Sequence, residues 1–164
     1  MSRLITVSLD KRGVSCVARL LDEAAPRTCA AVWDALPLSA QVFHGKYARN
    51  EIYTLLPTFA ADPGKENTTV TPIPGDLCWF SFDSDQLGNP AYGYENTTGT
   101  GTTGAIVDLA LFYGRNNLLI NGDQGWVPGN VFGAVIEGLD EMAAACQDLW
   151  MGGVRGETLS FARA

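Results

Sequence analysis

The sequence is poor in basic residues. Eleven lysines and arginines stand against eighteen aspartates and glutamates, so the formal net charge is -7 at pH 7. Nucleic-acid binding requires a basic surface, and attraction to an anionic membrane requires clustered lysine or arginine. Because the sequence shows no such cluster, we expect no nucleic-acid partner and no membrane partner.

Long apolar runs are also missing. No segment approaches the roughly 18 consecutive apolar residues that a membrane-spanning helix needs. Met1 leads almost directly into an alternating segment, residues 3–9, instead of the apolar block of a signal peptide. These two absences predict a cytoplasmic protein.

Histidine and paired cysteine ligands for a metal are scarce. His44 is the only histidine, and the four cysteines form no C-x-x-C pair. We therefore expect no metal site. Cys16, Cys29, Cys78 and Cys146 each stand in an apolar context, which favours reduced core residues, although four thiols would also allow two disulfides.

One glycine-rich string matches a cofactor motif. Residues 99–104 read G-x-G-x-x-G, the dinucleotide fingerprint. That fingerprint leaves a strand and opens a helix, whereas here a polar loop precedes the glycines and residues 105–113 alternate like a strand. We therefore predict a loop at this string, and no cofactor.

The apolar pattern predicts a mainly β fold. A chain of 164 residues, 46% of them hydrophobic, is long enough for one compact domain over residues 1–164 and too short for two ordinary ones. Apolar segments that alternate or are bounded by turn residues predict strands at residues 4–9, 14–20, 40–43, 51–56, 77–82, 105–113, 118–120, 131–136 and 158–161. Helical periodicity predicts helices over residues 26–36 and 138–151, and residues 58–75 and 83–104 read as loops. Roughly eight strands with two helices favour a closed or nearly closed barrel.

Two strings resemble cyclophilins. Ala25-Pro26-Arg27-Thr28 is similar to the Pro-Lys-Thr pattern that opens the first barrel-capping helix of that family. Residues 131–139, VFGAVIEGL, resemble its Val-Phe-Gly strand followed by Glu-Gly and a helix. The resemblance implies an eight-stranded cyclophilin-like β-barrel capped by two α-helices.

Four shorter strings resemble a bacterial family of small cyclophilin-like proteins of unknown function. They are His44-Gly45-Lys46, Asn50-Glu51-Ile52-Tyr53, Pro74-Gly75-Asp76 and Tyr113-Gly114. This second resemblance implies the same fold and no assigned activity.

The cyclophilin active site has a changed counterpart in this chain. The resemblance places the catalytic arginine of cyclophilins near Glu51, which reverses the charge. That arginine donates hydrogen bonds to the prolyl group of the substrate, and an ionised carboxylate has no proton to donate. The histidine expected shortly before Val131 is replaced by the stretch from Trp126 to Asn130. We therefore expect no prolyl isomerase activity, and whether the chain is an enzyme stays open.

Charged and polar side chains gather between residues 43 and 53. A carboxylate beside an imidazole on a strand that faces a groove, here Glu51 and His44, can bind a polar ligand or act as an acid/base pair. The alternative is a solvated surface on which Glu51 pairs with Arg49 or Lys46.

These features predict a groove that binds a small polar metabolite. The predicted ligand-binding residues are His44, Arg49, Glu51, Tyr53, Trp79 and Tyr113. Aromatic walls with a few polar groups are the usual composition of such sites, but strand neighbours such as Trp79 and Phe80 face opposite sides, so only one of them can line the groove. Two alternatives remain: a hydrolase or isomerase that uses Glu51 and His44 as acid and base, or an accessory subunit of a larger enzyme. A homo-oligomer is compatible with either.

Overall fold

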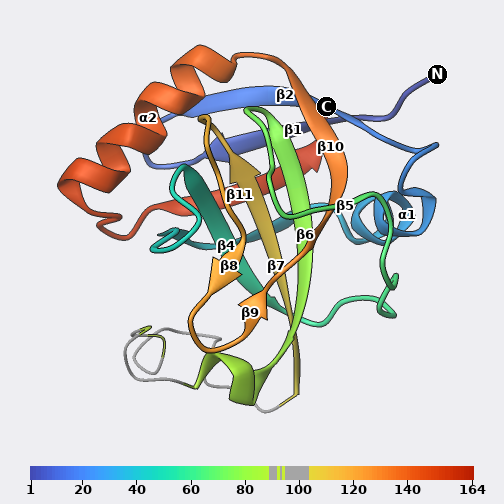
Figure 1. Ribbon diagram of the computed structural model, residues 1–164. Helices are drawn as coiled ribbons and strands as arrows, with labels where there is room; N and C mark the ends of the chain where they lie inside the picture. The colour runs from blue at the N-terminus through green and yellow to red at the C-terminus, as the bar shows by residue number, and fades with distance from the viewer. Residues whose placement is uncertain (89–91, 93, 95–103) are drawn as a thin grey trace.

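Eight antiparallel strands close into a barrel in the computed structural model, which describes residues 1–88, 92, 94 and 104–164 (Figure 1). The strands are β1 (Leu4–Leu9), β2 (Val14–Leu20), β3 (Leu38–His44), β4 (Glu51–Pro57), β6 (Asp76–Asp83), β7 (Ala105–Phe112), β10 (Gly129–Glu137) and β11 (Thr158–Arg163). Their order is β2-β1-β11-β3-β4-β7-β6-β10, and β10 pairs with β2 to close the ring. Closure removes unpaired strand edges, and it confirms the predicted closed eight-stranded barrel.

Two helices cover the barrel. α1 (Pro26–Ala35) and α2 (Leu139–Gly152) lie on opposite sides of it in Figure 1. α1 begins at Pro26, as the sequence predicts, because the missing N–H of proline needs no partner in a first helical turn. Buried side chains of both helices join the barrel interior in one apolar cluster.

Three short elements complete the described part. β5 (Thr68–Thr69) adds to β10 within the stretch that the sequence predicts as a loop, and the 3₁₀ turn η1 (Ser84–Leu87) follows β6. β8 (Ile120–Asn121) pairs with β9 (Gly125–Trp126) in a hairpin. The predicted strand over residues 118–120 is therefore mostly wrong. Apart from Gly104, the predicted loop over residues 99–104 lies outside the described residues.

The adjacent strands β4, β7 and β6 are apolar on both faces. One face, with Ile52, Leu109 and Trp79, packs into the barrel interior. The opposite face, with Tyr53 and Phe80, belongs to a second apolar cluster outside the barrel. Successive strand residues face opposite sides of the sheet. Because both faces are buried, other segments of the chain must cover the outer face as well.

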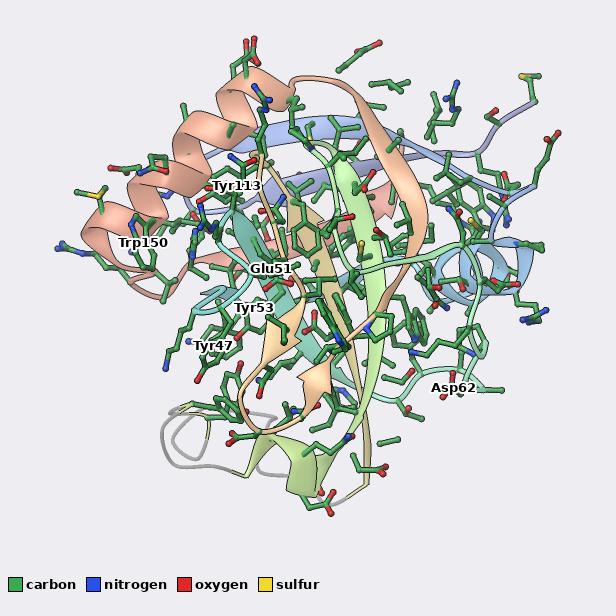
Figure 2. All side chains as sticks on the ribbon, in the orientation of Figure 1. Tyr47, Glu51, Tyr53, Asp62, Tyr113 and Trp150 are labelled. Atoms are coloured by element: carbon green, nitrogen blue, oxygen red, sulfur yellow. The ribbon has the colours of Figure 1, made fainter. Side chains whose placement is uncertain are left out.

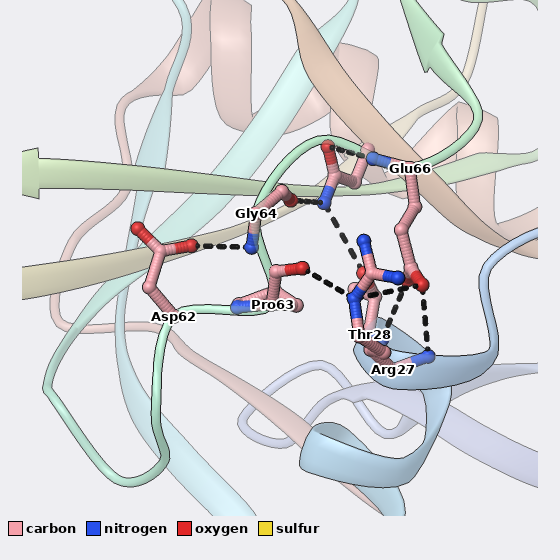
Figure 3. Close-up of polar contacts among 7 residues, drawn as sticks. Arg27, Thr28, Asp62, Pro63, Gly64 and Glu66 are labelled. Carbon is pink, nitrogen blue, oxygen red and sulfur yellow. Dashed lines mark hydrogen bonds and ion pairs between the residues drawn. The ribbon is translucent and has the colours of Figure 1, made fainter.

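The N-terminus of α1 is capped by a distant carboxylate. Glu66 is buried and accepts hydrogen bonds from the backbone N–H groups of Arg27 at 3.1 Å and Thr28 at 2.8 Å, and from the Thr28 hydroxyl at 2.8 Å (Figure 3). The Arg27 guanidinium lies 3.3 Å from the same carboxylate. Burial alone would raise the pKa of Glu66, but these hydrogen bonds and the guanidinium lower it. Glu66 thus satisfies first-turn amides that Ala25, at the N-cap, leaves without a side-chain partner.

The four cysteines are buried and unpaired, in the core positions that the sequence predicts. Among the described residues, no helix combines the length and apolar character needed to cross a membrane.

Candidate functional site

A pocket lies on the outer face of β4, β7 and β6. The loop after β3 and the segment around the β8–β9 hairpin form its other sides, and its lining includes Tyr47, Leu119 and Val127. Its enclosed volume is about 100 Å³. That is a few times the roughly 30 Å³ that one water molecule occupies in the liquid, so the enclosed part suits one end of a small molecule.

Strand register brings two acidic side chains to this pocket. In the antiparallel pairing, Leu55 of β4 and Phe80 of β6 both lie opposite Asp108 of β7. Glu51 lies four residues before Leu55 on the same face of β4, with Tyr53 between them. Both carboxyls therefore point to one side of the sheet, and both line the pocket.

The two carboxyls are buried without a cationic partner. Asp108 is 7% exposed and Glu51 8% exposed. The Oδ1 atom of Asp108 is fully buried and accepts no hydrogen bond from any described residue. The ion pairs between described residues use Asp22, Asp148, Glu157 and Glu66 instead. The remaining residues, 89–91, 93 and 95–103, include no lysine, arginine or histidine.

Burial changes the ionisation of both groups. Desolvation disfavours the charged form of a carboxyl, and it raises the pKa of Glu51 from 4.5 to about 8. Desolvation also raises the pKa of Asp108 well above its ordinary value, and the negative charge of Glu51 raises it further. The pocket therefore holds carboxyls that are protonated near neutral pH. The solvated-surface alternative for Glu51 is wrong.

Aromatic rings form the walls. Tyr53 stacks on Phe43 with ring centroids 5.5 Å apart, and its hydroxyl is hydrogen-bonded to the Tyr94 hydroxyl. Tyr94 meets Phe43 edge to face at 5.2 Å. Tyr92 donates from its hydroxyl to Asp123 Oδ2 at 2.7 Å, and its carbonyl accepts from Lys46 Nζ at 3.1 Å. Tyr53 of β4 is thus hydrogen-bonded to Tyr94, and Tyr92 is hydrogen-bonded to Lys46 in the loop after β3.

Two of the six predicted ligand-binding residues, Glu51 and Tyr53, line this pocket. Arg49 is exposed and has a left-handed backbone conformation, φ 75°. Trp79 faces the barrel interior, where it packs against Phe59 and donates from Nε1 to the Ser81 hydroxyl at 2.8 Å. Its neighbour Phe80 is the one that lines the pocket, as alternation along a strand requires.

The other two predicted residues meet at a second place. His44 Nε2 and the Tyr113 hydroxyl are 2.6 Å apart, and the His44 ring lies 4.9 Å from the Trp150 ring of α2. Figure 2 shows Tyr113 and Trp150 beside α2, away from Tyr47 and Tyr53. Burial lowers the pKa of His44, which favours the neutral imidazole. His44 lies opposite Ile52 in the β3–β4 pairing, so it and Glu51 belong to opposite faces.

Sequence reasoning missed Asp108, the most unusual group in the pocket. One signal was present, because Asp108 is the only charged residue in the run AIVDLALF of β7. A single acid in a strand buried on both faces costs free energy unless it is hydrogen-bonded or paired, so it marks a candidate functional residue. The tyrosines at positions 47, 92 and 94 were also missed, and they lie outside regular strands.

Gly45 leaves the space that the Glu51 carboxyl occupies. A β-carbon at position 45 would lie 2.6 Å from Glu51 Oε1 and 3.1 Å from Glu51 Cβ. We expect Gly45→Ala to displace this carboxyl and to lower the free energy of unfolding by about 1–3 kcal/mol, as overpacking does. Urea denaturation measures the change. Gly122→Ala is the control, since a β-carbon at Gly122 meets nothing within 4 Å, and equal stability of the two variants would contradict the packing described.

No group of three or more histidine, cysteine, aspartate or glutamate side chains within the described ranges is arranged to hold a metal ion.

Comparison with known families gives one match. The model of a family described as "Protein of unknown function (DUF3830)" matches residues 7–161, nearly the whole chain. No curated protein shows significant sequence similarity to the chain.

Solved structures share the fold at low sequence identity. McbB, solved in complex with tryptophan, is 19% identical with a TM-score of 0.62, and the match covers 97% of this chain but 44% of McbB. The hypothetical protein AF2241 from Archaeoglobus fulgidus is 20% identical with a TM-score of 0.54, covering 99% of this chain and 95% of the other. The Mimivirus cyclophilin is 12% identical with a TM-score of 0.51, covering 99% and 87%. This chain therefore has a cyclophilin-like fold and spans less than half the length of McbB.

Proposed function

We propose that the chain, which belongs to the DUF3830 family of proteins of unknown function, binds a small polar molecule in the pocket outside β4, β7 and β6. A single observation supports this proposal most strongly. Asp108 lines the pocket, and its buried Oδ1 has no hydrogen-bond partner among the described residues. A buried polar atom left unsatisfied costs about 1–3 kcal/mol, and a bound ligand would recover that cost.

The rest of the lining has the composition expected of a ligand site. Phe80, Tyr53 and Leu55 supply apolar surface, whereas Glu51, Asp108 and Asn121 supply polar groups at separate points. Small-molecule sites are usually concave and mainly apolar, with a few polar groups that fix the orientation of the ligand.

Thermal-shift screening of the purified protein against small metabolites tests this function. We expect at least one compound to raise the melting temperature, and Asp108→Asn or Glu51→Gln to weaken its binding. Tryptophan belongs among the compounds because McbB, which shares the fold, was solved with it. Asp76→Asn is the matched control, since Asp76 is a partly buried carboxyl on β6 that is not part of the pocket lining. Ligand affinities that are unaffected by both pocket variants would sink the proposal.

A second candidate function is acid–base catalysis in the same pocket. The observation that favours it is Glu51, because a carboxyl with a pKa of about 8 is suited to proton transfer near neutral pH. Glu51 would work with Asp108, since His44 belongs to the opposite face. A turnover assay with the compounds found by screening tests this candidate: the rate should follow the ionisation of Glu51 and vanish in Glu51→Gln.

A further inference from the structure

Acidic groups outnumber basic groups in the pocket lining. Glu51 and Asp108 both contribute buried carboxyls, and Lys46 is the one basic side chain among the lining residues. Lys46 Nζ donates to the Tyr92 carbonyl at 3.1 Å, and the ion pairs between described residues include neither carboxyl. A positively charged group brought by a ligand would favour ionisation of one of these carboxyls, because an opposite charge nearby stabilises the carboxylate.

The aromatic walls also favour a positive charge. Phe80 and Phe82 stack with centroids 6.2 Å apart and an interplanar angle of 9°, and Tyr53 and Tyr94 join them in the lining. The faces of aromatic rings carry partial negative charge, so a cation near them is attracted, most strongly where water is excluded. The same rings can pack against an apolar body.

The unpartnered oxygen of Asp108 favours a hydrogen-bond donor beside it. An ammonium group has N–H donors and a positive charge, so it satisfies the hydrogen bond that Asp108 Oδ1 lacks and stabilises the ionised carboxylate. From this geometry we propose that the pocket binds an organic amine, with its ammonium group on Asp108 and its apolar part against the aromatic walls. This inference rests on the proposed function and names the class of ligand.

Other ligand classes fit less well. An anionic ligand brings no positive charge to stabilise an ionised Asp108, and it would be repelled by either carboxyl as soon as that carboxyl lost its proton. A neutral alcohol can donate one hydrogen bond to Asp108 Oδ1, but it brings no charge to compensate the carboxylate. The amine is therefore expected to bind more tightly than an alcohol or an acid of the same shape.

Three probe molecules of similar shape test this expected order of affinities. Isothermal titration calorimetry of the full chain measures the affinities for 2-phenylethylamine, 2-phenylethanol and phenylacetate, while the shifts of backbone amide NMR signals locate binding. We expect the amine to bind at least about tenfold more tightly than the alcohol, a ratio that equals about 1.4 kcal/mol. We expect phenylacetate to bind more weakly than the alcohol.

Two variants assign the preference to one carboxyl. Asp108→Asn, which keeps the shape and removes the charge, should abolish the preference for the amine, whereas Asp76→Asn outside the pocket should retain it. Proton release by the unaltered protein gives a second readout that needs no variant. Burial keeps the pKa of Asp108 high in the free protein, so an amine that ionises it should release protons to the buffer and the alcohol should not.

Other titratable groups face the same pocket and belong in the interpretation of proton release. They are Glu51, Lys46, Tyr47, Tyr53, Tyr92 and Tyr94. The tyrosine hydroxyls whose pKa is raised, those of Tyr53, Tyr92 and Tyr94, stay protonated at neutral pH and release nothing. Glu51→Gln separates the contribution of Glu51 from that of Asp108.

The outcomes separate this inference from the function on which it rests. Equal affinity for amine and alcohol, or an amine preference that persists in Asp108→Asn, would overturn the inference while leaving a small-molecule pocket. If none of the three probes shifts the NMR signals of pocket residues at millimolar concentration, the inference fails, whereas the proposed function is decided separately by the screen of small metabolites.

Discussion

Asp108→Asn should make the protein more stable at pH 8, and the gain should shrink as the pH is lowered toward 5. Asp108 has a raised pKa in the folded state because it is buried without a partner. Between the unfolded pKa and the folded pKa, the folded protein holds a proton that the unfolded chain has lost. The contribution of Asp108 to the free energy of unfolding is therefore fully present below the unfolded pKa, and it is lost as pH rises toward the folded pKa. For one such group, the free energy of unfolding falls by about 1.4 kcal/mol per pH unit in this range.

Urea denaturation of the unaltered protein and of Asp108→Asn, at half-unit steps across this pH range, measures the effect. Glu51→Gln should act in the same direction up to about pH 8, because burial raises the pKa of Glu51 to about 8. Asp62→Asn is the control, since Asp62 is exposed and accepts one hydrogen bond, from the Gly64 N–H at 2.9 Å. An Asp108→Asn protein that is less stable than the unaltered one at every pH would contradict the unpartnered, protonated carboxyl.

Glu66→Gln should strongly destabilise the fold. The Glu66 carboxylate accepts three hydrogen bonds from Arg27 and Thr28, and the Arg27 guanidinium is 3.3 Å away. An amide replaces one acceptor oxygen with a donor, so an N–H at the start of α1 loses its partner. A buried donor left unsatisfied costs about 1–3 kcal/mol, and the lost charge adds to it, so we expect a loss of about 3 kcal/mol.

Thermal and urea denaturation measure this loss, with Asp62→Asn again as the control. Asp62 belongs to the same loop, as Figure 3 shows, but it lies at the surface and its amide variant keeps the acceptor for Gly64. We expect the control to change stability by less than about 0.5 kcal/mol. Because the pKa of Glu66 is lowered, its contribution is present above its unfolded pKa and is lost as pH falls through the folded pKa. Equal stability of the two variants at pH 7 would show that Glu66 does not cap α1.

The sequence predicts much of the barrel because its signals are local. Alternation places the residues of β1 and β2, and Pro26 marks the start of α1. The cap of α1 was not predictable in this way. It comes from Glu66, 38 residues after Thr28, and only the closed fold brings the two together.

The candidate site was predictable only in part. Glu51 and Tyr53 follow from the concentration of charge in one segment and from the resemblance to cyclophilins. Asp108 was missed because the β4–β7 register, which sets it opposite Leu55, depends on long-range pairing that one sequence does not reveal. Trp79 and Phe80 show a related limit, since alternation says that they face opposite sides without saying which side is the pocket.

The proposed amine site is tested most directly by a crystal structure of the protein grown with 2-phenylethylamine. The proposal predicts electron density for the amine in the pocket, with its nitrogen within hydrogen-bonding distance of Asp108 Oδ1 and its ring against Tyr53 and Phe80. Density for the amine only elsewhere, or an Asp108 Oδ1 that is hydrogen-bonded to another group of the protein, would contradict it.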